Sequence, residues 1–544
     1  MMDDQQTQYS SLHIGHLGLV ADMIHHIGLI QEIDKRLPIS EAHGSKVTHG
    51  ERVAAMILNG LGFIDSRLYL FPEFLADKAV DRLFGKPLHP EWFNDDALGR
   101  TLTAINAYGS TKLFSEIALR VGSDLQLIDR YFHLDTTTLS LFGDYFNAQG
   151  DATPQQGYAK SGRHDLKQMV LLLATTGAAH MPVWMQSLSG NVSDQVSLPD
   201  AAARMHQFCS SLIDSEDFIY VADSALYSNV LELSNIHWIT RVPERTKEAK
   251  RLVSKPEEEI AWQEITPGYK GYEIQSTYKS VKQRWLLVHS EAAYKREIQT
   301  LEKQIEKAEQ AQEKQWWHLS NHCFQCHEDA QAAIEKLRKT LKYHHVHADI
   351  QPVTQHAAPG RPKVDAKQQV VGYQVNYRLE QNQQKITEKK QSKGRFILAT
   401  NKLDASDLSS ADILKEYKGQ SGTESGFKFI KDDAFQVDNV FLKTPERIDA
   451  LMMVMTLCLM VYGISQYKLR QSMKKQNVSI PNQAGKMTQN PSMKWVYFLF
   501  RSVHELHIQT QTTINRVVLN VHEGLQDIIR HFGARARAIY FNSS

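Results

Sequence analysis

Four short apolar runs between residues 130 and 244 constrain the fold more than any other feature of this sequence. "RYFHLDTTTLSLFG" is aromatic and β-branched, and "QMVLLLATTGAAHMPVWMQSLSG" holds two apolar halves separated by a turn signal. That turn signal predicts a hairpin. Two further buried strands are indicated by "DFIYVADSAL" and "NIHWITRVPE". Helical spacing is found in "DQVSLPDAAARMHQFCSSL", which lies between the hairpin and these two strands. The order strand, hairpin, helix, strand, helix, strand predicts an α/β domain with a mixed sheet.

Helical periodicity is found toward both ends of the chain. Residues 10–130 place apolar side chains at three-to-four spacing, which predicts a helical domain. The apolar run "LMMVMTLCLMVYGI" at 451–464 is too short to span a bilayer, so we expect a buried core helix and no membrane. Residues 246–392 are charged and rich in Gln, Glu and Lys, and "GRFILATNKL" then resumes core-strand character. The charged part is therefore interpreted as an insertion that contains a long helix.

At 544 residues the chain is too long for one ordinary domain. We predict five segments: a helical N-terminal domain for DNA binding or dimerisation (1–129), the first part of the α/β core (130–245), an insertion domain (246–393), the second part of the core (394–440), and a basic C-terminal helical region (441–544).

The net charge of +1 conceals an asymmetry between the two ends. Residues 1–130 carry 12 Lys and Arg against 17 Asp and Glu, whereas residues 441–544 carry 13 against 5. A basic C-terminal segment is compatible with nucleic-acid binding, although a solvated basic face is at least as common. The four cysteines are too scattered for a disulfide framework, and the acidic, polar start is no signal peptide. We therefore expect a cytoplasmic protein.

Two aspartates lie within or at the end of predicted buried strands. Asp135 follows "YFHL", and Asp223 follows "FIYVA". A carboxylate there is costly unless it is paired or holds a metal, and two on neighbouring strands could share Mg²⁺. A third carboxylate from a packed helix would complete a two-metal site for phosphoryl transfer. For either aspartate alone, a strand-end cap or turn residue is the alternative.

The stretch "EYKGQSGTESGFKFIKD" at 416–432 combines glycines with a polar stripe. On a helical wheel, an arc of roughly 60° holds four polar residues: Tyr417, Gln420, Glu424 and Lys431. The opposite face holds Gly419, Gly422 and Gly426. We predict that the glycine face packs closely against the sheet or a neighbouring element, while the other face carries Glu424 toward the aspartates. A glycine-rich loop with fortuitous spacing is the alternative.

Taken together, these segments resemble a known family. "LDTTTL" around Asp135, "YVADSALYS" around Asp223 and the Y-x2-Q-x3-E-x6-K pattern resemble the three acidic blocks of DDE transposases. The third block looks like the Y-x2-R-x3-E-x6-K signature of a large group of bacterial insertion sequences. "GYAKSGRHDLKQ", "GNVSD", "FLKTPERIDALMMVMTLCLMVY" and "IPNQAGKMTQNPSMKWVYFLF" fit one branch of that group, many of whose members begin with a helical domain of unknown function. The resemblance runs nearly end to end.

The resemblance implies an RNase H-like mixed sheet that is flanked by helices and interrupted by a large insertion. Asp135, Asp223 and Glu424 would be the catalytic residues and would bind two Mg²⁺ ions, with Mn²⁺ as an alternative. The same site would cleave the transposon end and transfer the strand into target DNA. The implied partners are the terminal inverted repeats and target DNA, bound by a homodimer in a synaptic complex at the nucleoid.

The resemblance also implies contacts with the DNA backbone. Tyr417 and Lys431 would contact phosphates near the cleaved end. Gln420 stands where the family has Arg, and an amide donates a hydrogen bond but supplies neither charge nor a bidentate fork. Further candidates for backbone contact lie in the "GYAKSGRHDLKQ" loop, for which a solvated polar loop is the alternative: Lys160, Arg163 and His164.

Two other functions would use the same motifs. One is an RNase H-like nuclease that hydrolyses nucleic acid without strand transfer, and the other is a catalytically silent DNA-binding regulator. Two short segments outside the acidic blocks also contain metal-ligating residue types. "CFQCH" at 323–327 lacks a second Cys/His pair at finger-like spacing, which favours structural thiols. "YHHVH" at 343–347 is a possible metal site by composition only.

Overall fold

The computed structural model forms two compact units. The first comprises residues 1–240, 279–281 and 415–544, and the second comprises 241–278 and 282–414. The finer division of the chain into five segments stays a prediction. The structure describes residues 7–541 except for these: 40–44, 63–69, 143–144, 146–151, 158–161, 214–216, 234, 357–367, 432–441, 443 and 511.

The sheet of the first unit has the strand order β4-β3-β2-β5-β6. β2, β3 and β4 pair antiparallel, whereas β5 is parallel to β2 and β6 is parallel to β5. A three-stranded meander extended by two parallel strands on the side of its first strand is the topology of an RNase H-like fold, which confirms the predicted fold class. The strands are β2 (Tyr131–Leu141), β3 (Lys167–Thr176), β4 (Met181–Ser189), β5 (Ile219–Ala222) and β6 (His237–Arg241).

The apolar runs of the sequence explain these strands. β3 is buried along almost its whole length, because helices cover the sheet where its side chains are continuously apolar. The β3–β4 hairpin turns at Gly177 and His180, which both have positive φ. α8 (Asp194–Ser210) connects β4 to β5. The helix expected between β5 and β6 is a 3₁₀ helix, η4 (Leu226–Leu233), that packs on α8.

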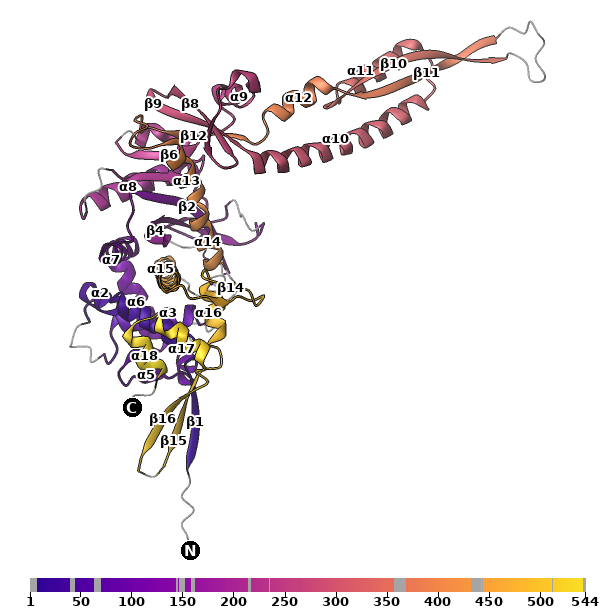
Figure 1. Cartoon of the computed structure of the whole chain (residues 1–544). Helices are drawn as coiled ribbons and strands as arrows, with labels where there is room; N and C mark the ends of the chain where they lie inside the picture. The colour runs from indigo at the N-terminus through magenta and orange to yellow at the C-terminus, as the bar shows by residue number, and fades with distance from the viewer. Residues whose placement is uncertain are drawn as a thin grey trace. The chain divides into compact units, whose positions relative to one another are not determined.

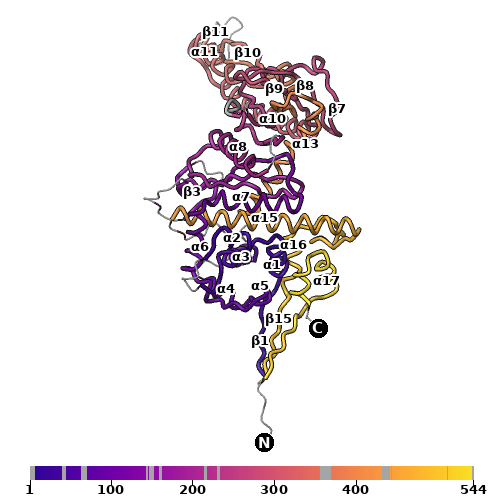
Figure 2. Tube along the Cα trace, turned by 90° about the vertical axis from the view of Figure 1, so that its left-hand side faces the viewer, coloured from indigo at the N-terminus to yellow at the C-terminus, as the bar shows by residue number. Residues whose placement is uncertain are grey.

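A single long helix organises the rest of the first unit. α15 (Pro445–Gln476) packs against the N-terminal helices and against β4 and α7, and Figure 2 shows it crossing the unit between α7 and α3. It is the one helix among the described residues that is long and apolar enough to cross a membrane, and 78% of its most apolar window is buried. The expected core helix at 451–464 is therefore confirmed as part of a longer helix.

The helical N-terminal region packs against the C-terminal end of the chain. The buried carboxylate of Asp22 accepts hydrogen bonds from the backbone N–H groups of Gly533 and Ala536, and the Tyr540 hydroxyl donates to the carbonyl of Gly15 at 2.7 Å. The N-terminal helices are α1 (Leu17–His26), α2 (Leu29–Arg36), α3 (His49–Gly60), α4 (Phe71–Ala76), α5 (Val80–Phe84), η3 (Pro90–Phe93), α6 (Asp95–Tyr108) and α7 (Ser110–Asp124).

A small sheet that helical periodicity did not predict joins the two ends of the chain. β1 (Gln8–His13) pairs antiparallel with β15 (His504–Gln509), which in turn pairs with β16 (Ile514–Leu519). The C-terminal region therefore mixes strands with helices, and its remaining elements are β13 (Ile480–Pro481), β14 (Met487–Thr488), α16 (Met493–Leu499), α17 (Glu523–Arg530) and α18 (Ala534–Tyr540).

In the second unit the strands β12, β9, β8 and β7 are hydrogen-bonded in that order, and β10 and β11 form a two-stranded ribbon. The predicted charged helix is α10 (Glu291–Ser320), which lies along β11 (Figure 1). Trp316 of α10 joins α11 and the ribbon in a small apolar core. The other elements are α9 (Lys247–Val253), η5 (Glu257–Glu259), β7 (Gln263–Thr266), β8 (Tyr269–Tyr278), β9 (Val281–Ser290), α11 (His327–Arg338), β10 (His344–His356), β11 (Gln368–Gln381), α12 (Gln383–Gln391) and β12 (Arg395–Thr400).

Candidate active site

The two aspartates lie on neighbouring parallel strands of the first unit. Asp135 is half-buried in the middle of β2, whereas Asp223 directly follows β5 and is exposed. The register of β2 and β5 joins His133 to Val221. Continued by two residues, this register brings Asp135 level with Asp223. Residues at matching register on parallel strands share a face of the sheet, so both carboxylates belong to one surface.

Local hydrogen bonds orient both aspartates. The backbone N–H of Thr136 donates to Oδ1 of Asp135 at 2.8 Å, and the backbone N–H of Ala225 donates to Oδ1 of Asp223 at 2.9 Å. The Thr240 hydroxyl donates to the backbone carbonyl of Asp223 at 2.6 Å and so ties the end of β5 to β6. Each side chain is thereby held by its own chain segment, which limits the rotamers that the carboxylates adopt.

A further carboxylate, which sequence reasoning did not assign, contacts Thr136, the residue after Asp135. The hydroxyl of Thr136 donates to Oδ1 of Asp194 at 2.6 Å, at the first residue of α8. Asp194 closes the segment "GNVSD", so its position in a family-like segment was the available signal. Its contact fixes the start of α8 beside the residue that follows Asp135.

Glu424 comes from a helix that is anchored to the same strands. α14 (Ser421–Ile430) packs on β2 and β3, and the buried hydroxyls of Thr423 and Thr175 lie 2.7 Å apart. Nε2 of Gln420 donates to the carbonyl of Leu134 at 3.4 Å, next to Asp135 in the chain. Glu424 is exposed and follows Gln420 by one helical turn. These contacts hold the helix that carries Glu424 against the strand that carries Asp135.

The polar stripe spans two helices that meet at Gln420. Tyr417 lies in the last turn of α13 (Ser410–Gly419), and Lys431 directly follows α14 and is exposed. Tyr417 is half-buried. The residue at the junction keeps a right-handed helical backbone, with φ −52° and ψ −26°. The glycine-rich segment is therefore helical on both sides of Gln420, and the loop alternative is wrong.

The three glycines let this helix pair approach its neighbours. A Cβ added at Gly422 would lie 2.0 Å from Nδ1 of His180, and one at Gly419 would lie 3.0 Å from Cε1 of His133. At Gly426 the added atom would lie 3.0 Å from a methyl group of Leu459 on α15. The predicted close packing of the glycine face is thus confirmed, and its partners are two histidines of the sheet and the long core helix.

A cluster of buried His133, half-buried Glu416 and exposed His180 lies beside the helix pair, and sequence reasoning did not identify it. Nε2 of His133 lies 3.4 Å from Oε2 of Glu416, in the turn that precedes Tyr417. Burial raises the pKa of Glu416, but hydrogen bonds with His133 and Lys415 outweigh it and leave this pKa below its ordinary value. Partial desolvation by the surrounding protein, with a contribution from His133, lowers the pKa of His180. His133 lies two residues before Asp135, which was the available sequence signal.

The three loop residues that the sequence offered as DNA-backbone contacts differ in what the structure shows of them. Arg163 and His164 are exposed in the connection between β2 and β3, and Lys160 lies outside the described residues. The Arg163 guanidinium holds Asp165 through two bonds, from Nε at 2.8 Å and from Nη2 at 2.7 Å. This pairing lowers the pKa of Asp165 to about 2. Arg163 therefore has a carboxylate partner of the same bidentate geometry that a phosphate offers.

Comparison with known proteins assigns the chain to a family. Residues 132–461 match the transposase DDE domain family, and residues 9–119 match a domain of unknown function, DUF4277. No curated protein matches the chain. A cryo-EM structure of a piggyBac transposase synaptic complex with hairpin DNA is similar at 10% identity and a TM-score of 0.36, covering 91% of this chain and 83% of that one. Because the domain match covers more than half of its residues, the chain belongs to the transposases with a DDE domain.

Proposed function

We propose that this transposase cleaves DNA at transposon ends and transfers the cleaved strand into target DNA, with Asp135, Asp223 and Glu424 as catalytic residues. One observation carries the proposal. Two aspartates share a register on adjacent parallel strands, and the helix that bears Glu424 is anchored to one of those strands. Membership in the transposase family supports DNA as the substrate. The shared register of the two aspartates and the packing of the Glu424 helix on β2 support these three residues as the site.

The donor set fits two Mg²⁺ ions, or Mn²⁺ in their place. Three carboxylates offer only oxygen atoms, which hard divalent cations prefer. Backbone N–H groups already hold Oδ1 of Asp135 and of Asp223, so the protein has a pre-oriented pair of ligands before Glu424 joins them. Bound ions would activate water or a 3′-hydroxyl as nucleophile and stabilise the leaving oxygen.

The residues of the polar stripe are proposed to position DNA beside these carboxylates. Lys431 supplies charge at an exposed position, and Tyr417 supplies a hydroxyl one helical turn before Gln420. Gln420 uses one amide N–H for the carbonyl of Leu134, and its second N–H remains suited to a phosphate oxygen. Gln420 would therefore serve both to anchor the helix and to contact DNA, but as a neutral donor.

The loop after β2 is proposed to add backbone contacts. For Arg163 to bind a phosphate, it must exchange Asp165 for the phosphate oxygens, a swap between two bidentate partners. Lys160 and His164 would add further contacts from the same loop. The remaining partners are the terminal inverted repeats and target DNA, held by a homodimer in the bacterial cytoplasm at the nucleoid. The excess of 13 basic over 5 acidic residues in 441–544 supports binding to DNA.

The test is a strand-joining assay with the full-length protein. Oligonucleotides that carry the pre-cleaved ends of the element are incubated with a plasmid target and Mg²⁺, and joined products are separated by electrophoresis. We expect joining by the wild type and its loss in Asp135→Asn, Asp223→Asn and Glu424→Gln. Asp200→Asn is the matched control, because Asp200 is an exposed carboxylate on α8 that pairs only locally with Arg204.

Two outcomes would contradict the proposal in different ways. Hydrolysis of the DNA without joined products would identify a nuclease that lacks strand transfer. Joining that survives Asp135→Asn would show that these carboxylates are not the catalytic set and would favour a regulatory DNA-binding role for this surface.

A further inference from the structure

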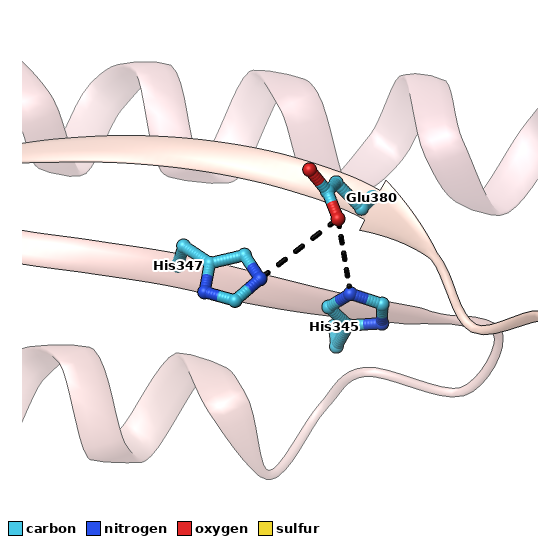
Figure 3. Close-up of side chains that lie close together, drawn as sticks. All are labelled: His345, His347 and Glu380. Atoms are coloured by element: carbon cyan, nitrogen blue, oxygen red, sulfur yellow. Dashed lines mark hydrogen bonds and ion pairs between the residues drawn. The ribbon is translucent and has the colours of Figure 1, made fainter.

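The β10–β11 ribbon of the second unit gathers metal-ligating side chains that the proposed transposition chemistry does not use. His345 and His347 come from β10, and Glu380 comes from β11. We propose that these three residues bind a divalent transition-metal ion of the zinc class across the ribbon. Figure 3 shows both imidazoles turned toward the Glu380 carboxylate.

The register of the ribbon explains why these side chains meet. His345 pairs directly with Glu380, and His347 is two residues further along the same strand. Side chains at i and i+2 of a strand share one face, and a cross-strand partner stands about 5 Å away between Cβ atoms. Two histidines and one glutamate therefore converge from the ladder itself and require no loop to position them.

The distances suit a small tetrahedral ion. Nε2 of His345 lies 3.3 Å from Oε2 of Glu380, and Nε2 of His347 lies 3.8 Å from the same oxygen. All three ligand atoms lie within 4.8 Å of one another. Bonds of about 2.0–2.1 Å in a tetrahedral zinc site place the ligand atoms about 3.3 Å apart. Small rotations of exposed side chains would close the remaining gap.

The surroundings of the cluster separate it from the apolar core. The intervening residue Val346 is buried in the core that Trp316 and Val375 also form, so the ladder backbone is fixed from the opposite face. Arg378, which pairs with His347 in register, donates from Nε to Oε1 of Glu380 at 2.9 Å. Oε2 is then the oxygen directed at the imidazoles, which is the role that outer hydrogen bonds play at metal ligands.

The ligand types select the class of ion. Two imidazoles and one carboxylate suit Zn²⁺, Co²⁺ or Ni²⁺, whereas Mg²⁺ prefers oxygen ligands only. Three protein ligands leave a fourth position for water. The ion would join β10 to β11 and stabilise the ribbon, because metal bound only to the folded state adds its binding free energy to that state.

The test uses the full-length protein after chelation and dialysis. Co²⁺ is titrated in the presence of excess Mg²⁺ while the visible absorption of a four-coordinate site is recorded, and Zn²⁺ is titrated by calorimetry. We expect one high-affinity ion per chain. The affinity should fall at least tenfold in Glu380→Gln and further in the double variant H345A/H347A. Glu424→Gln should retain the signal, since that residue belongs to the other site.

The control variant is His318→Ala, which removes an exposed histidine of α10 from the same unit. It should bind the ion as the wild type does. All variants are compared by circular dichroism and by thermal melting, and Zn²⁺ should raise the melting temperature of the wild type but not that of H345A/H347A. Equal affinity and stoichiometry in the wild type and H345A/H347A would overturn the proposal and leave these residues as a cross-strand ion pair only.

Discussion

The α13–α14 helix pair of the first unit and the β10–β11 ribbon of the second unit position carboxylates by opposite means. Glu424 is exposed, but the helix pair is fixed by close contacts to the buried Thr175 and His133 and to the exposed His180. Glu380 is positioned by the ribbon itself, through strand pairing and through Arg378. A site on packed helices therefore depends on residues that never reach the ligand, whereas a site on an exposed ladder depends almost entirely on register.

The two sites also differ in the ions that their atoms suit. Asp135, Asp223 and Glu424 offer oxygen atoms only, and His345 and His347 add two imidazole nitrogens to the oxygen of Glu380. Hard ions favour the first set and borderline ions favour the second. One chain would thus hold two metal sites that do not compete for the same ion.

The largest expected effect comes from a substitution that should change the activity of the first site and leave metal binding at the ribbon unchanged. Glu424→Gln should lower strand joining on the order of 10³-fold, about 4 kcal/mol of transition-state free energy, because it removes a charged ligand from the catalytic set. Zn²⁺ affinity at the ribbon should not change. Calorimetry and the joining assay on the same preparation measure both quantities. A parallel loss of Zn²⁺ binding would show that the two sites are not independent.

Low pH should reduce the unfolding free energy of the first unit, because a buried histidine must become protonated. Burial lowers the pKa of His16 to about 4 from 6.5, although a hydrogen bond to the carbonyl of Leu61 opposes the shift. The fold favours neutral His16, so its contribution is complete above pH 6.5 and is lost as pH falls toward 4. The difference amounts to about 3 kcal/mol of unfolding free energy.

The measurement is the free energy of urea unfolding of the first unit at pH 7 and at pH 4, for the wild type and His16→Gln. The wild type should lose about 3 kcal/mol more than the variant over this interval. The glutamine amide can still donate toward Leu61 but does not titrate. Equal pH dependence of the two proteins would show that His16 does not carry this acid sensitivity.

Gly422→Ala tests whether close packing positions the helix that carries Glu424. Its Cβ would lie 2.0 Å from Nδ1 and 2.4 Å from Cγ of His180, an exposed residue. Because the overlap reaches the base of the ring, the whole imidazole must turn aside or the β3–β4 turn must move, at a cost of about 1–3 kcal/mol. Strand joining should fall as well. His180→Gly in the same chain should restore much of both losses, and a double-mutant cycle measures this coupling. Ser425→Ala, at an exposed position of α14, is the control, and an uncoupled cycle would contradict the packing role.

The sequence predicted those parts of the fold that depend on local pattern. The strands around Asp135 and Asp223 follow from short buried runs, and the helical stripe of Glu424 follows from spacing. The contacts of His180 with Gly422 did not follow, because they join segments that are distant in sequence. For the same reason "YHHVH" alone could not reveal its third ligand, since Glu380 is brought to it only by the register of β10 and β11.

The smallest expected effect is that of Gly372→Ala, which repeats the glycine test on the ribbon. A Cβ added at Gly372 of β11 would lie 2.3 Å from Sγ of Cys323 and 2.9 Å from the carbonyl oxygen of Phe324. Cys323 is exposed, so its thiol can rotate into solvent, and only a slight backbone adjustment at Phe324 remains. Gly372→Ala should therefore cost about 1 kcal/mol or less in unfolding free energy of the second unit, and Cys323→Ala should recover part of it. A cost above that of Gly422→Ala would break the comparison, because it would show that the exposed ribbon is packed as stringently as the helix that carries Glu424.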